Sequence, residues 1–253
     1  MLDQVSAVAR AAGRIAAARC GGAFRRWEKE AGSPVCEVDL EVDSFLRESL
    51  AKLDPDAGWL SEETLDSSDR IERRRLWVVD PIDGTRDFLR GRPGWCVSVA
   101  LVEDRLPVLG VLDAPARGEH WTAAAGLGAW RNGERIRASD RTKLAGARVP
   151  ADELPSVDSD LRLVPKPNSI ALRIALVAAG DADLVATLRW GHEWDIAAAA
   201  LIASEAGAAV SGALGQPLAF NSASGQAFGI LASAAGIHAE ALERLRERAL
   251  ALV

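Results

Sequence analysis

Two aspartates, Asp80 and Asp83, stand at the end of a short apolar run, and a Gly-Thr pair follows them directly. The run, residues 76–79, predicts a buried strand, and a proline stiffens the turn between the two carboxylates. Because unpaired charge is costly to bury, carboxylates at the exit of a core strand favour binding of a hard cation such as Mg²⁺. Gly84 and Thr85 could present backbone N–H groups to a phosphate. The alternative is an aspartate-rich turn without a ligand.

Two further segments supply carboxylates that could join this pair. Glu62 follows a short extended segment, residues 58–61, and Asp195 stands where a helix is expected to begin. Carboxylates that gather without a cation repel one another, so their convergence would indicate a metal site built from oxygen ligands. Asp195 has an alternative role, because an aspartate at the start of a helix is commonly a cap. In a metal site, paired cations could activate a water molecule and neutralise the oxygen that leaves a phosphate.

The string Asp80-Pro81-Ile82-Asp83-Gly84-Thr85 resembles the signature of the lithium-sensitive, Mg²⁺-dependent phosphomonoesterases. This family includes inositol monophosphatase, fructose-1,6-bisphosphatase and the 3′(2′),5′-bisphosphate nucleotidases of the CysQ branch, and the similarity extends over most of the chain. The resemblance implies a layered αβαβα sugar-phosphatase fold and two or three Mg²⁺ ions in the site, with Mn²⁺ as an alternative. It also implies the metal ligands, which are the side chains of Glu62, Asp80, Asp83 and Asp195 and the backbone carbonyl of Ile82.

The resemblance further implies a pair of residues that handles the attacking water. Asp39 closes a Ser-Pro-Val-Cys-Glu-Val-Asp segment that matches the family's Ser-Pro-Val-Thr-x-Ala-Asp. With the hydroxyl of Thr85, Asp39 would orient and deprotonate that water. Asp39 could also be a helix N-cap, and the two roles are compatible. Cys36 replaces the usual threonine, and Ala31 stands where many relatives carry an aspartate, which puts a third, weaker metal site in doubt.

Substrate contacts are expected from Gly84, Thr85, Glu193 and Asp195. The Glu193-Trp194-Asp195 triplet resembles the CysQ branch, whereas inositol monophosphatases carry a glutamate seven residues before the helix aspartate, where this chain has Leu188. Leucine cannot accept a hydrogen bond from an inositol hydroxyl. The resemblance therefore implies a 3′(2′),5′-bisphosphate nucleotidase that hydrolyses adenosine 3′,5′-bisphosphate to AMP and phosphate.

Two other functions stay open. An inositol-1-monophosphatase or another sugar-phosphate phosphatase is the alternative enzyme, and a non-catalytic protein that binds a phosphorylated metabolite is a more remote one. The presence of every expected metal ligand argues against the non-catalytic protein. Lys166 and Arg189 are both candidates for binding the 5′-phosphate of a nucleotide, and the sequence does not choose between them.

Composition excludes several classes of protein. The 253 residues carry a net charge of −6 at pH 7, which argues against a surface that coats a nucleic-acid polymer. No apolar run approaches the roughly 20 residues that span a bilayer, and the N-terminal segment does not resemble a signal peptide. The 3 cysteines lack metal-type spacing and leave one over after any pairing, which favours reduced thiols in the cytoplasm. We expect a monomer or homodimer that acts on a small-molecule phosphate ester.

The coarse pattern predicts an antiparallel α+β half over residues 1–138 and a smaller α/β half over residues 139–253. The first half would carry most of the metal ligands, and the second would supply Asp195 and the residues that set specificity. The Asn-Gly pair at 132–133 predicts a tight primed hairpin turn, and the polar residues 66–75 predict an exposed loop or helix. The expected helices cover residues 2–20, 39–53, 169–179, 194–206 and 238–252, and the expected strands cover residues 76–79, 96–102, 108–112, 161–164, 184–188 and 228–232.

Overall fold

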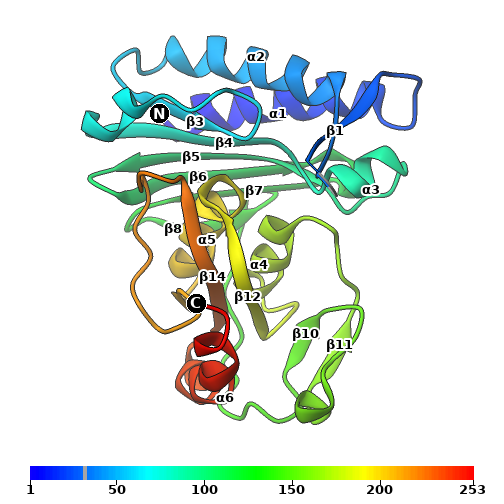
Figure 1. Cartoon of the computed structure of the whole chain (residues 1–253), viewed down its shortest axis with the longest axis vertical. Helices are drawn as coiled ribbons and strands as arrows, with labels where there is room; N and C mark the ends of the chain where they lie inside the picture. The colour runs from blue at the N-terminus through cyan, green and yellow to red at the C-terminus, as the bar shows by residue number, and fades with distance from the viewer. Residues whose placement is uncertain (31–32) are drawn as a thin grey trace.

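The computed structural model describes residues 1–30 and 33–253. Layers of helix, sheet, helix, sheet and helix follow one another, from α1 (Leu2–Arg19) and α2 (Glu37–Ala51) at one end to α6 (His238–Leu250) at the other (Figure 1). This order is the predicted αβαβα arrangement. Ala31 lies outside the described residues, so the inference about a third metal stays a prediction. The division of the chain at residue 138 also stays a prediction.

The larger sheet lies directly beneath α1 and α2 (Figure 1). Its strand order is β3-β4-β5-β6-β7-β8-β9; β3 and β4 are parallel, and every other neighbouring pair is antiparallel. The strands are β3 (Gly58–Ser61), β4 (Arg75–Asp83), β5 (Cys96–Glu103), β6 (Leu106–Ala114), β7 (Glu119–Ala124), β8 (Gly128–Arg131) and β9 (Glu134–Arg135).

Strand β4, which carries the signature, is buried on both faces. Side chains alternate across a strand, so Trp77 and Val79 join the hydrophobic cluster under α1 and α2, whereas Leu76 and Val78 join the cluster on the opposite face. A strand covered on both sides requires apolar residues at successive positions. This requirement explains the continuous apolar run that predicted the strand, and it fixes where the following carboxylates emerge.

The smaller sheet and its helices form the rest of the layers. Helices α4 (Ile170–Ala178) and α5 (Ala197–Glu205) lie between the two sheets (Figure 1). The smaller sheet has the order β12-β14-β13 with antiparallel pairs, although strands and helices alternate along this part of the chain. Its strands are β12 (Leu184–His192), β13 (Ala208–Ser211) and β14 (Gln226–Ala234). Outside the two sheets lie a short helix, α3 (Thr85–Leu89), and the strand pairs β1 (Arg26–Glu30) with β2 (Ser33–Cys36) and β10 (Arg148–Pro150) with β11 (Arg162–Val164).

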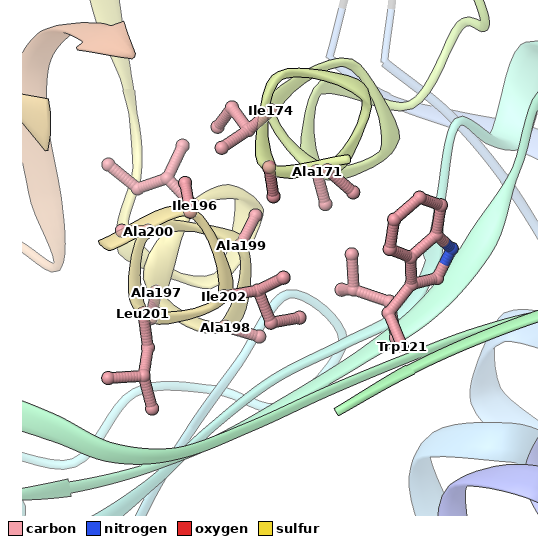
Figure 2. Packing of buried hydrophobic residues seen from close by; sticks show 14 of the residues in the cluster. Trp121, Ala171, Ile174, Ile196, Ala197, Ala198, Ala199, Ala200, Leu201 and Ile202 are labelled. Atoms are coloured by element: carbon pink, nitrogen blue, oxygen red, sulfur yellow. The ribbon is translucent and has the colours of Figure 1, made fainter. Parts of the chain in front are cut away.

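Helix α5 is buried all round, and it approaches the larger sheet closely at Ala198. Figure 2 shows α5 beside α4, whose Ala171 and Ile174 point towards it, in one cluster with Trp121 of β7. A Cβ added to Gly110 of β6 would lie 2.7 Å from the carbonyl oxygen of Ala198. The single hydrophobic cluster formed here combines residues from 60 to 232, so both halves of the chain share it.

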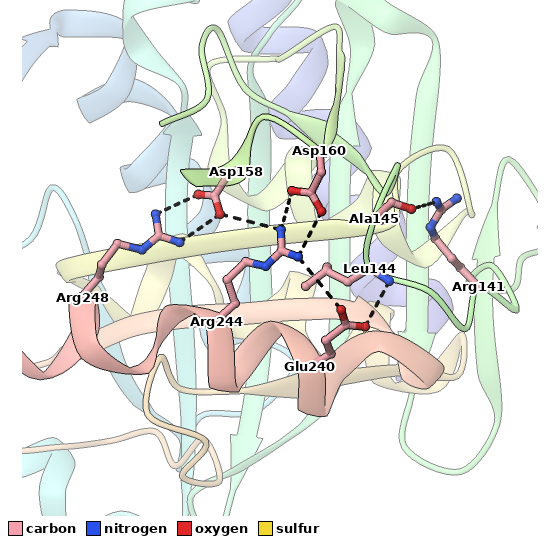
Figure 3. Close-up of polar contacts among 8 residues, drawn as sticks. All are labelled: Arg141, Leu144, Ala145, Asp158, Asp160, Glu240, Arg244 and Arg248. Carbon is pink, nitrogen blue, oxygen red and sulfur yellow. Dashed lines mark hydrogen bonds and ion pairs between the residues drawn. The ribbon is translucent and has the colours of Figure 1, made fainter. Parts of the chain in front are cut away.

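Helix α6 is tied to the segment before β11 by ion pairs. Arg248 donates to both carboxylate oxygens of Asp158, at 2.8 and 3.1 Å, and Arg244 donates to both of Asp160, at 2.6 and 3.0 Å (Figure 3). Asp158 is 6 % exposed, so its bidentate pair is the better shielded of the two. These contacts fix the outermost helix on the smaller sheet.

Most expected elements are confirmed, and two differences matter for function. Residues 68–72 form a short 3₁₀ turn in which Arg70 is only 2 % exposed, so the exposed segment predicted at 66–75 is wrong at this position. The helix predicted at 194–206 begins with a separate 3₁₀ turn, Glu193–Asp195, before α5. Asn132 and Gly133 both have positive φ, which confirms the primed turn.

Two properties predicted from composition can be compared with the structure. Within residues 1–30 and 33–253, no helix is both long and apolar enough to cross a membrane. Cys20, Cys36 and Cys96 are all free thiols.

Candidate active site

The end of β4 opens into a cavity of about 510 Å³ that collects the predicted residues. Glu62 comes from the segment after β3, and Asp195 comes from the 3₁₀ turn before α5. The remaining predicted lining residues come from the end of β4 and the start of α3. The lining includes Glu62, Asp80, Ile82, Asp83, Gly84, Thr85 and Asp195, together with Arg86, Lys166, Asn168, Ile170, Arg173 and Arg189.

A break in the β4–β5 ladder shapes the signature. The pairing register shifts between Asp80 and Asp83, so the two residues between them do not follow the regular ladder. Within this bulge the amide of Ile82 donates to Asp80 at 2.9 Å, and the Thr85 hydroxyl donates to the carbonyl of Ile82 at 3.0 Å. Gly84 has φ of 95°, and a Cβ there would lie 2.6 Å from the carbonyl oxygen of Gly94. Glycine is therefore required at this turn.

The carboxylates raise one another's pKa. Burial raises the pKa of Asp80 well above its usual value, and the charges of Glu62, Asp83 and Asp195 raise it further. Burial and the charge of Asp83 raise the pKa of Asp195 to about 7, against the opposing effects of the His192 amide and Arg189. Such repulsion is relieved when a cation binds among the carboxylates.

The donor set fits Mg²⁺ chemically, although the side chains do not form a closed cage. Carboxylate and carbonyl oxygens are the ligands that this ion prefers. Within the described part of the chain, no three histidine, cysteine, aspartate or glutamate side chains are placed to hold one metal ion. Asp83 provides a reason, because its carboxylate accepts from the Ser169 hydroxyl at 2.5 Å and from the Ala171 amide at 2.8 Å. Both bonds go to Oδ2, whereas Oδ1 accepts only a long bond from the Ile170 amide at 3.4 Å, so Oδ1 leaves coordination feasible.

Asp39 is fully buried at the start of α2 and is not among the residues that line the cavity. Its carboxylate accepts from the amide and from the thiol of Cys36, each at 2.9 Å, which makes Cys36 the N-cap and Asp39 its capping-box partner. The alternative role as the N-cap itself is therefore wrong. The negative charge of Asp39 contributes to the raised pKa of Asp80. The Thr85 hydroxyl donates to Ile82 rather than to Asp39.

Glu193 lies in a different place from the one expected. It is 0 % exposed, and its two carboxylate oxygens accept from the amides of Asn221 at 2.6 Å and Ser222 at 2.8 Å. Its carboxylate is thus occupied by a neighbouring loop and does not face a substrate in the cavity. The sequence does not reveal the contact between Glu193 and Asn221, because the two residues are far apart along the chain.

Two buried residues that support the site were also missed. Asp43, one turn after Asp39 on α2, accepts from the hydroxyls of Ser61 and Thr64, the latter at 2.6 Å, and so brackets Glu62. Arg70 donates to Asn221 at 2.7 Å, and Asn221 donates through its backbone to Glu193. The buried position of Asp43 could have been predicted from the sequence, because it is a charged residue on the apolar face of a helix. The sequence carried no comparable signal for Arg70.

Basic residues line the cavity together with the carboxylates. Arg173 donates to the backbone carbonyls of Pro167 at 2.9 Å and Asn168 at 2.5 Å, which holds its guanidinium at the rim. Lys166 pairs with Asp152, and Arg189 is exposed. The register of β12 shifts between Thr187 and Trp190.

Leu188 does not face the cavity. It packs against the cluster under α6 and lines a separate apolar cavity of about 200 Å³. Its neighbour Arg189 is the residue of this strand that lines the candidate site. The prediction that Leu188 takes the place of a glutamate in contact with substrate is therefore wrong.

Comparisons with known proteins agree on a family. The sequence model of the Inositol monophosphatase family matches residues 1–251 of this chain. A fructose-1,6-bisphosphatase/inositol-1-monophosphatase of Thermotoga maritima is 37 % identical over 186 residues, which cover 70 % of this chain and 70 % of that protein. The 3′(2′),5′-bisphosphate nucleotidase CysQ of Escherichia coli O157:H7 is 32 % identical over 231 residues, which cover 86 % of this chain and 93 % of that protein. An IMPase structure from Thermotoga maritima superimposes with a TM-score of 0.85 at 31 % identity, covering 97 % of this chain and 96 % of the other.

These relatives do not single out the CysQ branch that the sequence predicted, because inositol phosphatases and bisphosphate nucleotidases match at similar identity. What they share is a metal-dependent phosphomonoesterase scaffold, and the observed layers are those of that scaffold. The chain belongs to the inositol monophosphatase family and is a metal-dependent phosphomonoesterase.

Proposed function

We propose that this phosphatase prefers small substrates with a second phosphate group, with adenosine 3′,5′-bisphosphate as the first candidate. The observation that supports this class is the distribution of charge around the cavity. Lys166, Arg173 and Arg189 line the same cavity as the carboxylates. Guanidinium and ammonium groups are the usual partners of phosphate, so this part of the wall suits an anion that is not being hydrolysed. The volume of about 510 Å³ lies in the range of small-ligand pockets.

The chain's own residues have separable roles in the proposed reaction. Bound by Glu62, Asp80, Asp83, Asp195 and the carbonyl of Ile82, Mg²⁺ would supply a water nucleophile at neutral pH and neutralise the leaving oxygen. Asp39 would take the proton of the attacking water, and the hydroxyl of Thr85 would orient that water. The amides of Gly84 and Thr85 would hold the phosphate that is cleaved.

The test compares phosphate release from adenosine 3′,5′-bisphosphate, inositol 1-phosphate and fructose 1,6-bisphosphate at one Mg²⁺ concentration. We expect the highest kcat/KM for the nucleotide. Arg189→Ala should raise KM for the nucleotide about tenfold, equal to about 1.4 kcal/mol, and leave KM for inositol 1-phosphate nearly unchanged.

Arg246→Ala, at an exposed position on α6, is the matched control and should change neither KM. Equal loss on both substrates in Arg189→Ala would contradict a second-phosphate site. Preference for inositol 1-phosphate is the second candidate function, supported by the fructose-1,6-bisphosphatase/inositol-1-monophosphatase name of one relative. That result would retain the phosphatase and reject the bisphosphate substrate.

A further inference from the structure

A serine, a histidine and an aspartate form a hydrogen-bonded series on the sheet face beneath α1. The hydroxyl of Ser6, on α1, lies 2.6 Å from Nε2 of His120, on β7. Nδ1 of the same imidazole lies 2.7 Å from the carboxylate of Asp113, on β6. These residues are not among those that line the candidate active site. The phosphatase chemistry therefore leaves the group unexplained.

The order of the groups fixes the direction of the hydrogen bonds. A carboxylate only accepts, so Nδ1 of His120 carries the proton that Asp113 receives. The other nitrogen, Nε2, then has a free lone pair and accepts the hydroxyl proton of Ser6. This is the arrangement in which an aspartate orients a histidine and the histidine acts as a general base towards a serine.

The surrounding structure holds the base rigidly. Asp113 and His120 are direct partners across the β6–β7 ladder, and they are 6 % and 4 % exposed. The backbone amide of His120 donates to the side chain of Asn132 at 2.8 Å. Ser6 is only partly buried, so it is the member of the group with a part of its surface exposed to solvent. A buried base hydrogen-bonded to the hydroxyl of a partly exposed residue is the geometry of an activated nucleophile.

Helix α1 carries a glycine, Gly13, at the place where it meets the carboxylate of Asp113. A Cβ at Gly13 would lie 1.9 Å from Oδ2 of Asp113, so no other residue fits there without moving the carboxylate. Glycine in the interior of a helix makes the helix less stable than alanine does. Gly13 stands two turns after Ser6, so both face the sheet. An alanine-rich helix that only had to cover the sheet would not need this glycine.

We propose that Ser6 is a nucleophile that accepts one activated phosphoryl or acyl group. In this step Oγ forms a bond to the phosphorus or carbonyl carbon, the bond to the leaving group breaks, and the leaving group departs with its electron pair. The hydroxyl proton passes to Nε2 of His120, which later releases it to solvent. The amide of Ser6 is already a donor within α1, so the site offers no oxyanion donor from that residue to drive turnover. The product is a stable, stoichiometric modification.

The test treats the folded chain with a fluorophosphonate probe, from which fluoride is the leaving group, and maps the adduct by mass spectrometry. Ser44, an exposed serine on α2, is the internal comparison. We expect one adduct, on Ser6, formed at least about 100-fold faster than at Ser44. Equal rates at the two serines would overturn the proposal, and this comparison requires no variant.

Two variants separate activation from a purely structural role. Ser6→Ala should abolish labelling and leave phosphate release unchanged. Asp113→Asn keeps the size of the side chain but no longer enforces the histidine tautomer, so labelling of Ser6 should slow by about 100-fold or more. Unchanged labelling of Asp113→Asn, with a melting temperature equal to that of the original chain, would show that the group is only a polar contact between helix and sheet.

Discussion

At the residue scale, the main feature of the site is the close placement of several carboxylates, of which Asp80 and Asp83 are buried. Asp80 is 1 % exposed, and the pKa values of Asp80, Asp83 and Asp195 are all raised, in each case chiefly by burial. A raised pKa means that the folded chain binds protons more tightly than the unfolded chain does. The metal-free protein should therefore lose stability as these carboxylates ionise.

The sign of this effect can be tested at Asp195. Its pKa rises from 3.8 to about 7 on folding, so the metal-free chain should lose stability as the pH increases from about 4 to 7. Asp195→Asn should be more stable than the original chain at pH 7 in EDTA, because the substitution removes the charge and keeps an oxygen that can accept from His192. It should also weaken Mg²⁺ binding by tenfold or more. Thermal melts in EDTA and calorimetric titration with Mg²⁺ measure the two effects. A variant less stable than the original chain at pH 7 would contradict the repulsion argument.

At the element scale, the two segments that carry Glu62 and Asp195 are joined by a chain of hydrogen bonds through the buried side chain of Arg70. Arg70 holds Asp66 on one side, at 2.6 and 2.7 Å, and Asn221 on the other. Asn221 in turn holds Glu193 of the turn that contains Asp195. The contacts cross between sequence positions separated by 151 residues. This connection ties the turn that contains Asp195 to the segment that follows Glu62.

Removing Arg70 should therefore affect the metal site at a distance. Arg70→Ala leaves the buried amide oxygen of Asn221 unpaired and should lower stability by about 2 kcal/mol. It should also weaken Mg²⁺ binding several-fold, although Arg70 is not among the residues that line the cavity. Arg70→Lys keeps the charge but not the paired contact with Asp66. Its stability and Mg²⁺ affinity should lie between those of the original chain and those of Arg70→Ala. Calorimetric Mg²⁺ titration beside denaturant unfolding separates the two effects. Unchanged Mg²⁺ affinity in Arg70→Ala would reduce the network to a structural role.

At the scale of the whole molecule, the larger sheet, α4, α5 and the smaller sheet share one hydrophobic cluster that both halves of the chain build. Within it, Gly110 of β6 lies close to the backbone of Ala198 on α5. Backbone atoms cannot rotate away as a side chain can, so an added methyl group must displace the helix.

Gly110→Ala should for this reason destabilise the protein by about 1–3 kcal/mol. Gly118→Ala is the control, because Gly118 has φ of 63° but no atom within 4 Å of the added Cβ, so only backbone strain of about 1–2 kcal/mol applies. A kinetic readout adds to the comparison, since a displaced α5 should also reduce kcat through Asp195. If denaturant titration gives Gly110→Ala the same free energy of unfolding as the original chain, the sheet and α5 can separate at no cost.

The sequence was sufficient where short-range patterns determine structure. The apolar run before Asp80 predicted β4, and the motif from Asp80 to Thr85, in which a metal and phosphate site was predicted, lines a cavity at the end of that strand. Long-range features could not be predicted in this way. The roles of Glu193 and Arg70 depend on a loop folded over from residue 221, and the orientation of Leu188 depends on a register shift in β12.

The close contact between α5 and the larger sheet also bears on how such enzymes can diverge. A face made of alanines opposite a glycine tolerates few changes of size, so inherited substitutions there should be rare. Exposed rim positions such as Arg189 carry no such restriction. A change of substrate can therefore arise at the rim while the scaffold stays the same. Lineages of this kind can exchange one phosphate ester for another without losing the fold.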